Sequence, residues 1–539
     1  MTKQKNKIND LLVDISGIKF DKKYSRVANL HKYWARKPWY IIEQFTDRYT
    51  KIGDVVLDPF CGSGIIGYEA VMKNRNFIGY DLNPLACFLS EATIKNHFDK
   101  NIFNKELEDI SDKVKNRILK LYQTNFKCEK CGELKHITIS YIGSSFENKD
   151  EVDIACLQCG VSKTKERKKI TLTEKIKLDK NLWIPNIEFP KKFYKDRFSY
   201  KGIKNVQDFF TKRNLLALSI LYDVIFTNNY KYKHLFQLAF SNTLLHVSIL
   251  KSPNVRPLSV NNYWIPDDHI EENVWWRFLE RVKNVNLAKQ TQNERKKQIG
   301  IKNYGNYKIY NKSSLKMKDV DNKSIDYLIT DPPYGDAIQY SELSFIWNAW
   351  LSKEYKIKDE VIINPVQNKG HDEFISQIKK FVEEAYRVLK NEKFFTLCFQ
   401  NKNIQIWIDI IEIIKKTGFD LADIKIFDTY GSPYNKHWAK FSPKSDLYIT
   451  FIKKEKKNKT TKELKTFYIE EIIKKIINDS KIEKVSFDIG KGYDLFVAYT
   501  IEKIFDNYQL SDYKKIQIKD VINIFETITK YGNIQGRIL

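Results

Sequence analysis

The sequence Asp54-Val-Val-Leu-Asp58-Pro-Phe-Cys-Gly-Ser-Gly64 decides the fold, because an apolar strand here runs directly into a glycine-rich turn. Residues 65–73 then predict a helix, and Phe77-Ile-Gly-Tyr-Asp81 predicts a second strand that ends in an acid. A strand, a glycine-rich turn, a helix and a second strand in this order form a βαβ unit with two parallel strands. The sequence therefore predicts an α/β protein built on a parallel sheet.

This alternation stops after the second strand and resumes near Tyr307. Helices predicted over 374–389 and 404–416, and strands over 394–399 and 446–452, extend the same sheet. We therefore expect a doubly wound, Rossmann-like sheet with a large insertion between its second and third strands. The expected parts are the first half of the sheet domain, the insertion, the second half, and a small, mostly helical C-terminal domain, at 1–99, 100–300, 301–455 and 466–539.

The glycine-rich turn is the expected contact with a nucleoside cofactor. Glycine has no Cβ, so the main chain can pass close to a ligand, and the helix N-terminus behind the turn offers N–H groups to a carboxylate. Asp81 can accept hydrogen bonds from both hydroxyls of a ribose. Neither a P-loop nor a dinucleotide fingerprint fits, because no Gly-Lys-Ser/Thr follows and only Gly62 and Gly64 are suitably placed.

Asp331-Pro-Pro-Tyr334 follows another apolar strand and is the candidate catalytic motif. The Asp331 carboxylate and the Pro332 carbonyl can accept the two hydrogens of an exocyclic amine on a flat base, which aims the nitrogen lone pair. Pro332 and Pro333 stiffen the turn, and Tyr334 can stack on a base flipped out of a duplex. A simple proline turn is the alternative for these four residues alone, but the upstream motifs in the expected order favour a catalytic site.

Four cysteines form two CxxC pairs, each followed by a glycine, within a segment of about 126–162: Cys128, Cys131, Cys156 and Cys159. Two such knuckles complete a tetrahedral Zn²⁺ site with no open position, so the sequence predicts a structural zinc ribbon inside the insertion. A redox dithiol is the alternative, although redox motifs rarely come doubled. The remaining cysteines lie in core-like stretches and are expected to be buried.

The chain is strongly basic, with 92 Lys and Arg against 67 Asp and Glu and a net charge of +25 over 539 residues. Such a balance favours a polyanionic partner, nucleic acid above all, although a lysine-rich proteome would produce it too. Residues 1–10 are polar, and the apolar run 215–226 is short and contains Asp223, so neither a signal peptide nor a membrane span is expected. We expect an intracellular protein of the cytoplasm, associated with the nucleoid.

A basic and aromatic stretch follows the second CxxC pair. Residues 163–180 are rich in lysine and arginine, and aromatic and basic side chains then alternate at Tyr194, Lys195, Arg197, Phe198, Tyr200 and Lys201. Interleaved cations and rings suit a nucleic-acid groove. A solvated charged face is an equal alternative for any single residue of the stretch.

Taken together, these motifs resemble those of the DNA amino-methyltransferases, and the whole arrangement looks like the adenine-specific DNA methylases that contain a zinc ribbon. The most specific stretch is Asp-Pro-Pro-Tyr-Gly-Asp-Ala-Ile-Gln-Tyr-Ser-Glu-Leu-Ser at 331–344, with support from 31–38 and 58–84. The resemblance covers about 25–95 and 305–452. It implies methyl transfer from S-adenosylmethionine to adenine N6 in double-stranded DNA, with the insertion as target-recognition region and restriction or defence-system subunits as possible partners.

The resemblance also implies roles for single residues. The catalytic set is Asp331, Pro332, Pro333 and Tyr334. The cofactor-binding set is His31, Lys37, Pro38, Asp58, Pro59, Phe60, Cys61, Gly62, Gly64, Asp81 and Leu82, in which Phe60 would lie against the adenosine and the upstream residues beside the methionine end. One departure concerns the third motif, where Asn311-Lys-Ser-Ser replaces the acid that often touches the cofactor adenine.

Other functions stay open from the sequence. Cytosine N4 is the nearest, because both amines fit the same pair of acceptors, and an Asp rather than a Ser before Pro-Pro leans toward adenine. RNA or a glutamine side chain can also be methylated at such a motif. A zinc-ribbon DNA-binding subunit with an inactive methylase core is a further alternative, against which the intact Asp331 and glycine turn argue.

Overall fold

The computed structural model describes residues 7–13, 24–34, 36–143, 151–170, 176–194, 201–255, 257, 263–300, 303–354, 357–428, 445–455, 464–485 and 489–530. Its centre is an eight-stranded sheet with the strand order β1-β12-β13-β11-β10-β2-β3-β9. These strands are β1 (Leu12–Val13), β2 (Val55–Asp58), β3 (Asn76–Tyr80), β9 (Tyr307–Tyr310), β10 (Ile325–Thr330), β11 (Leu389–Phe399), β12 (Phe419–Asp428) and β13 (Ser445–Lys453).

The sheet is mostly parallel and reverses its winding between β2 and β10. The chain runs outward from β2 to β3 and β9, then returns to the other side of β2 with β10 and β11. β10 pairs in parallel with both β2 and β11, whereas β13 is antiparallel to β11 and β12. Ligands of open α/β sheets bind at such a reversal, beyond the carboxyl ends of the strands. Asp58 ends β2 and Asp331 directly follows β10, the two strands that flank this reversal.

Helices cover both faces of this sheet because its strands are apolar on both sides. Val56 packs with α3 (Trp39–Tyr49) and α4 (Ile65–Met72), whereas its neighbour Leu57 packs with α13 (His371–Val388) and α14 (Ile404–Thr417). This alternation is the side-chain period of a strand buried on both faces. The elements expected from the sequence are present, but β12 was not predicted, because charged residues interrupt its apolar pattern.

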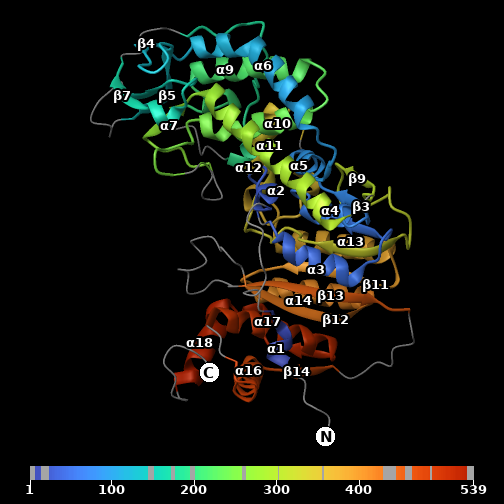
Figure 1. Ribbon diagram of the computed structural model, residues 1–539. Coiled ribbons are helices and arrows are strands. Elements are labelled where there is room, and N and C mark those ends of the chain that lie inside the picture. The colour runs from blue at the N-terminus through green and yellow to red at the C-terminus, as the bar shows by residue number, and fades with distance from the viewer. Residues whose placement is uncertain are drawn as a thin grey trace.

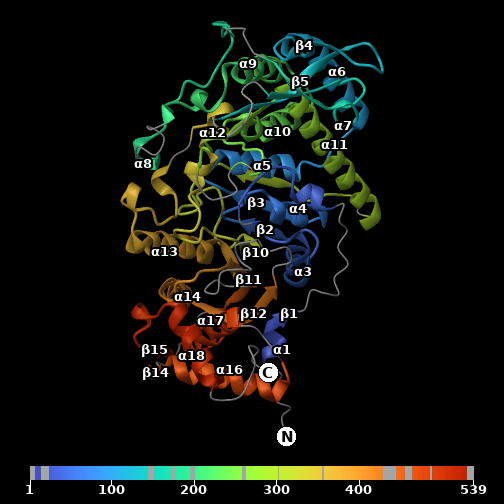
Figure 2. The same ribbon diagram turned by 90° about the vertical axis from the view of Figure 1, so that its left-hand side faces the viewer.

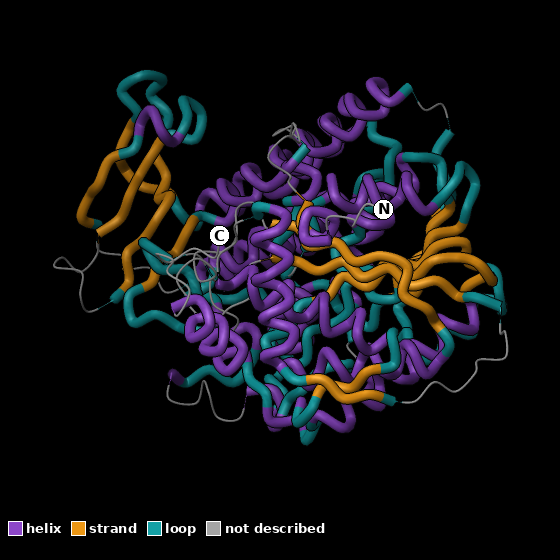
Figure 3. Tube along the Cα trace, turned by 90° about the horizontal axis from the view of Figure 1, so that it is seen from below, coloured by secondary structure: helices purple, strands orange, loops and turns teal. Residues whose placement is uncertain are grey.

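The insertion lies between β3 and β9 and forms the upper part of the molecule (Figures 1 and 2). Its helices are α6 (Lys100–Lys120), α7 (Val161–Thr164), α8 (Lys191–Tyr194), α9 (Lys212–Thr227), α10 (Lys233–Leu244) and α11 (Val274–Ile299). A five-stranded sheet combines β4 (Gln123–Lys127), β5 (Leu134–Ile142), β6 (Glu151–Ala155), β7 (Glu166–Lys169) and β8 (His269–Glu272). Figure 3 shows this small sheet standing apart from the twisted main sheet.

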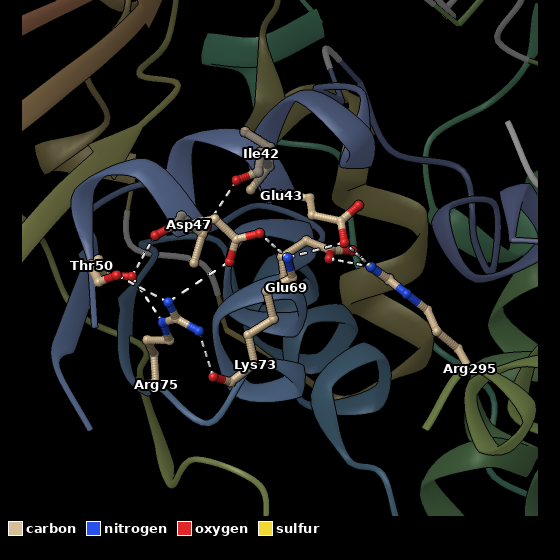
Figure 4. Close-up of polar contacts among 9 residues, drawn as sticks. Ile42, Glu43, Asp47, Thr50, Glu69, Lys73, Arg75 and Arg295 are labelled. Carbon is tan, nitrogen blue, oxygen red and sulfur yellow. Dashed lines mark hydrogen bonds and ion pairs between the residues drawn. The ribbon is translucent and has the colours of Figure 1, made fainter. Parts of the chain in front are cut away.

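The long helix α11 leads the chain back to the core and is fastened there by ion pairs (Figure 4). Arg295, in its last turns, donates to both carboxylate oxygens of Glu69 on α4, at 2.9 and 2.8 Å. Arg295 also lies 3.2 Å from Glu43 on α3, and Lys73 lies 3.1 Å from the same carboxylate. The insertion is therefore anchored to the helical layer of the core and not only joined to it by the chain.

The C-terminal residues add helices to the lower end of the molecule (Figure 1). They comprise α16 (Ile469–Glu483), α17 (Ile489–Phe505) and α18 (Ile518–Lys530), with the parallel strands β14 (Lys465–Phe467) and β15 (Tyr508–Leu510). Side chains of α17 belong to the same buried cluster as those of α13, α14 and the sheet. This helix therefore shares the core of the main sheet.

Shorter helices complete the described chain: α1 (Lys7–Leu11), α2 (Ser25–Ala28), α5 (Pro84–Ile94), α12 (Tyr340–Trp350) and the 3₁₀ turns η2 (Val206–Phe209), η3 (Leu245–Val247), η4 (Ile357–Asp359), η5 (Pro365–Gln367) and η6 (Tyr513–Lys515). Among the helices that the structure describes, none is both long and apolar enough to cross a lipid bilayer.

Candidate active site

A cleft with about 860 Å³ of empty space lies at the reversal point of the sheet. Its walls come from the upstream residues 33, 34, 36 and 37, the glycine-rich turn, the residues after β3, the 313–314 loop and the Asp331 motif. A concave site with a few polar groups among apolar walls is typical of cofactor sites. Apolar and aromatic walls come from Phe60, Ile65, Leu82 and Tyr340, and the acidic side chains are Asp58, Asp81, Asp331, Asp359 and Glu360.

The glycine-rich turn has a geometry that only glycine adopts without strain. Gly62 and Gly64 have φ values of 50° and 81°, in the left-handed region. A Cβ on Gly64 would come within 2.6 Å of the Ser90 Cα atom on α5, so this turn also needs the small residue for packing. Asp81 holds the turn from the next strand, because it accepts a hydrogen bond from the Gly62 backbone N–H at 2.9 Å.

On the cleft wall Asp58 is buried and Asp81 is partly buried, and hydrogen bonds offset only part of the cost of removing each carboxylate from water. Burial raises the pKa of Asp58 to about 8, although hydrogen bonds from Thr330 and the Phe60 backbone oppose the rise. Burial likewise raises the pKa of Asp81 to about 6, against hydrogen bonds from the Asn83 and Gly62 backbones. Buried carboxylates on a cleft wall are suited to accept hydrogen bonds from a ligand rich in donors.

Asp331 lies directly after β10 and carries a tyrosine and a lysine as neighbours. The Tyr334 hydroxyl donates to Asp331 Oδ1 at 2.5 Å. The Lys37 ammonium lies 3.5 Å from Asp331 Oδ1 and 3.5 Å from Asp446 Oδ2 on β13. Burial raises the pKa of Asp331 to about 7, although Lys37 and Tyr334 oppose that rise. Burial alone would lower the pKa of Lys37, but the two carboxylates outweigh it and raise that pKa, so Lys37 stays charged.

The loop that carries Asp331 is braced from behind by the C-terminal helix α17. Asn401 donates to the Tyr334 carbonyl at 2.9 Å, and the Asn401 carbonyl accepts from the Tyr493 hydroxyl of α17 at 3.1 Å. Asp494 of α17 accepts from the Gln400 side chain at 3.0 Å and from the Ser445 backbone N–H at 2.9 Å. These contacts position the end of β11 and the start of β13, which lie on one side of β10 and of the candidate catalytic motif.

The structure brings most of the predicted site residues together. The cleft is lined by Lys37, Asp58, Pro59, Phe60, Cys61, Gly62, Asp81, Leu82, Asp331 and Pro333. Outside this lining are Pro38, which precedes α3, Gly64, which begins α4, and Pro332 and Tyr334 of the catalytic turn. Their roles toward cofactor and base stay predictions.

His31 lies elsewhere. It lines a second cavity, and its Nδ1 atom is 2.8 Å from the Lys32 carbonyl oxygen. Its predicted contact with the cofactor stays untested by this geometry.

Sequence reasoning missed Asp446 and left open what replaces the acid of the third motif. Asp446 reads as the first residue of an apolar strand, and nothing in its neighbourhood predicts a contact with Lys37. Asn311, at the position where related motifs often carry an acid, donates to the Asp81 and Leu82 carbonyls at 3.0 Å each. Ser313 and Ser314 beyond it line the cleft. This asparagine, which the sequence marks as the departure in the third motif, therefore fixes the backbone of Asp81 and Leu82 at the cleft.

The four predicted metal ligands meet at the end of the small sheet. The Sγ atoms of Cys128, Cys131, Cys156 and Cys159 all lie within 4.8 Å of one another. Each pair sits on a turn whose glycine N–H donates to the carbonyl of the first cysteine, at 2.8 Å for Gly132 and 3.1 Å for Gly160. A hydrogen bond from the Lys130 backbone lowers the pKa of Cys128 to about 7. Four converging sulfur atoms are the donor set that Zn²⁺ prefers.

The basic stretch after the cysteines is described only in part, since 171–175 and Lys195, Arg197, Phe198 and Tyr200 lie outside the described residues. Within the described part, Arg167 is 3.0 Å from Asp153 and stacks on the Tyr141 ring, and Lys165 is 2.8 Å from Asp153. These two cations already have partners inside the small sheet.

Comparisons with known proteins add a family to this geometry. A family described as DNA methylase matches residues 2–92 and 325–524, together more than half of the chain. The type II methyltransferase M.MjaII of Methanocaldococcus jannaschii is 30% identical over 106 residues, which cover 20% of this chain and 19% of that protein. The type II methyltransferase M2.DpnII of Streptococcus pneumoniae is 43% identical over 60 residues, 11% of this chain and 22% of that protein.

The match thus spans only about a fifth of the length of these two curated relatives. Among solved structures, a SAM-dependent methyltransferase from Methanosarcina mazei is 8% identical, with a TM-score of 0.25, covering 76% of this chain and 98% of that one.

Proposed function

The chain belongs to the DNA methylase family, and from this premise we propose that it transfers a methyl group from S-adenosylmethionine to the N6 amino group of adenine at specific sites in double-stranded DNA. One observation carries the proposal. The Asp331 carboxylate, which can accept an amine hydrogen, lines the same cleft as the glycine-rich turn and Asp81. An Asp before Pro-Pro, rather than a Ser, supports adenine over cytosine.

The cleft fits the cofactor in its donor and acceptor chemistry. Asp81 and the glycine-rich turn would hold the ribose and the amino acid part, and Phe60 would lie against the adenine ring. When bound, S-adenosylmethionine supplies an electrophilic methyl group on a positively charged sulfur. The acidic side chains of the cleft favour a cationic ligand over an anionic nucleotide.

The catalytic motif prepares the amine for attack. The Asp331 carboxylate and the Pro332 carbonyl accept its two hydrogens, which draws the nitrogen lone pair out of conjugation and toward the methyl carbon. A nitrogen–carbon bond forms, a carbon–sulfur bond breaks, and the amine loses one proton. Asp331 is a competent acceptor for that proton, because burial raises its pKa to about 7. The hydroxyl of Tyr334 donates to Asp331 Oδ1 in this structure, so an entering base must either use Oδ2 or displace that hydrogen bond.

The test uses the purified protein, plasmid DNA and S-adenosylmethionine labelled on the methyl group. We expect label in DNA, and digestion to nucleosides should place it in N6-methyladenine. Label in N4-methylcytosine would keep the enzyme class and overturn the adenine assignment. Absence of label from DNA, with transfer to RNA or protein in parallel reactions, would overturn DNA as the substrate.

The cysteine cluster is proposed to hold one structural Zn²⁺, which would fold the small sheet of the insertion. The convergence of four sulfur atoms within 4.8 Å supports this proposal. Elemental analysis should find one zinc per chain. Cys128→Ser should lose zinc and weaken DNA binding while S-adenosylmethionine still binds, and Cys398→Ala, outside the cluster, should keep the metal. A metal-free protein with reduced cysteines and full activity would contradict the proposal.

A further inference from the structure

The loop after β9 lines the cleft two strands beyond the glycine-rich turn. Asp331 directly follows β10, Asp81 directly follows β3, and Asn311 directly follows β9. The strands β10, β2, β3 and β9 are parallel neighbours in this order, so these three residues lie in a row along one edge of the sheet. Neighbouring strands lie about 4.8 Å apart, which separates the loop from Asp331 by about 14 Å. A cofactor with its methyl group at Asp331 and its ribose at Asp81 would therefore extend its base toward this loop.

The loop is held at both ends. Asn311 donates through its side-chain amide to the Asp81 and Leu82 carbonyls, at 3.0 Å each. Farther along, the Met317 backbone N–H donates to the Glu384 carboxylate of α13 at 2.6 Å. Because both ends are fixed, the side chains between them are positioned before a ligand arrives.

Ser314 is the polar side chain that this loop buries at the cleft. It is 4% exposed and lines the cleft. Within the part of the chain that the structure describes, its hydroxyl makes no hydrogen bond, whereas the neighbouring Ser313 hydroxyl accepts one from the Leu315 backbone N–H at 3.3 Å. Buried polar groups normally have a partner. The Ser314 hydroxyl is therefore placed to meet a ligand in the cleft.

A hydroxyl recognises the edge of a base differently from a carboxylate. A carboxylate only accepts hydrogen bonds, whereas a serine hydroxyl both accepts and donates them. The edge of adenine carries an amine donor beside a ring-nitrogen acceptor, and a 6-oxopurine carries a carbonyl acceptor beside a ring N–H donor. The Ser314 hydroxyl can pair with either edge by rotating its hydrogen. An aspartate at the same position would favour the amine and disfavour the carbonyl oxygen.

We propose that Ser314 binds the base edge of the cofactor and leaves the cofactor site tolerant of a 6-oxopurine in place of adenine. This inference rests on the proposed function, because it requires S-adenosylmethionine in the cleft. Phe60, which lines the cleft after β2, would then cover the face of the ring while Ser314 meets its edge. The competing arrangement uses Asp359, an acid that also lines the cleft.

The test compares two ligands that differ at one position of the base. S-adenosylhomocysteine carries the 6-amino group, and S-inosylhomocysteine carries a carbonyl oxygen there. Calorimetry with the wild-type protein should give dissociation constants within about tenfold of each other, because the hydroxyl pairs with both edges. A larger preference for the adenine ligand would overturn the proposed tolerance.

Variants at position 314 test the hydroxyl itself. Ser314→Ala should weaken both ligands by about three- to tenfold, because each loses one neutral hydrogen bond. Ser324→Ala is the matched control and should keep both affinities, since its hydroxyl donates to the Asp321 carbonyl at 2.8 Å before β10 begins. Ser314→Asp should raise the preference for the adenine ligand by at least about tenfold, because a carboxylate cannot donate to the carbonyl oxygen. Melting temperatures establish that each variant is folded.

Asp359→Asn decides between the two arrangements. If this variant shifts the preference while the folded Ser314→Ala and Ser314→Asp proteins bind both ligands as the wild type does, Asp359 holds the base and the Ser314 assignment is overturned. If the preference depends on position 314 and not on position 359, the assignment is supported.

These outcomes are separable from those of the proposed function. Protein that binds S-adenosylhomocysteine through Ser314 but methylates nothing would remove the proposed reaction and leave the base contact in place. Protein that methylates DNA, while the folded Ser314 variants bind both ligands like the wild type, would remove the Ser314 contact and leave the reaction in place.

Discussion

Two groups of charged side chains in this protein differ in how closely each charge is paired with its partners. At the anchor of α11, Glu69 accepts two hydrogen bonds from Arg295 and one from Tyr24, at 2.9, 2.8 and 2.5 Å. In the candidate active site, the Lys37 ammonium stays 3.5 Å from both Asp331 and Asp446 and donates to the Tyr334 hydroxyl, which in turn donates to Asp331. The first group is closely paired and lies away from the cleft, whereas the second faces a space that a ligand can enter.

The difference shows how to distinguish a buried charge that stabilises the fold from a charge that takes part in a reaction. A buried pair with both partners fully bonded anchors two elements, and losing one partner leaves an unpaired buried charge. A buried carboxylate with loose partners and a raised pKa, on the wall of a cleft, retains acceptor capacity for a substrate. Four predictions test this distinction, in order of the size of the expected effect.

The largest effect should come from Asp331→Ala. We expect methyl transfer to fall by about a thousandfold or more, because the acceptor that orients the amine is lost, as when a preorganised donor is removed elsewhere. S-adenosylmethionine affinity, measured by calorimetry, should stay near that of the wild type. Substantial residual turnover would show that the Asp331 carboxylate does not take part in methyl transfer. Asp331→Ser keeps one acceptor and should lose less.

Glu69→Ala should act on stability instead of chemistry. Removing one partner of a buried pair typically costs about 3–5 kcal/mol, so the midpoint of denaturant unfolding should fall sharply. The double variant Glu69→Met with Arg295→Met should recover much of that loss, since no charge is left unpaired. The exposed pair of Lys416 and Glu412 is the control, where Glu412→Ala should change stability by less than about 1 kcal/mol. A Glu69→Ala protein that is as stable as the wild type but cannot methylate DNA would contradict the structural role of Glu69.

Asp81→Ala should weaken the cofactor and leave the catalytic motif intact. The carboxylate supports the Gly62 turn at 2.9 Å and is expected to meet the ribose hydroxyls, so its loss should cost about a hundredfold in S-adenosylmethionine affinity. At saturating cofactor the turnover rate should recover in part. An unchanged dissociation constant for S-adenosylmethionine would remove Asp81 from the cofactor site.

Lys37→Gln tests how the positive charge of Lys37 affects the pKa of Asp331. Because burial raises the pKa of Asp331 to about 7, activity should be present above this pH and lost as pH falls through it. Lys37 holds that pKa down, so its removal should raise the pKa further and move the acidic limb of kcat/KM to higher pH by about one unit. A limb that stays in place would show that Lys37 does not tune Asp331. Lys416→Gln provides the control profile.

The sequence by itself determined the parts of this protein that depend on local order. The βα motif with Gly62 and Gly64, the strand before Asp331 and the two CxxC knuckles are each encoded within a few residues, by periodicity and by the special backbone freedom of glycine. Family membership followed from the same motifs and is confirmed by the family match over residues 2–92 and 325–524.

Only the tertiary structure decided which distant residues meet. Lys37, Asp331 and Asp446 converge because β10 lies beside β2 while β13 returns antiparallel to β11, and this strand order is a property of the whole packed sheet. The support from α17 and the position of His31 in the second cavity depend likewise on how separate segments bury their apolar faces together. Sequence spacing specifies a turn, but only long-range packing brings the ends of separate strands to one point.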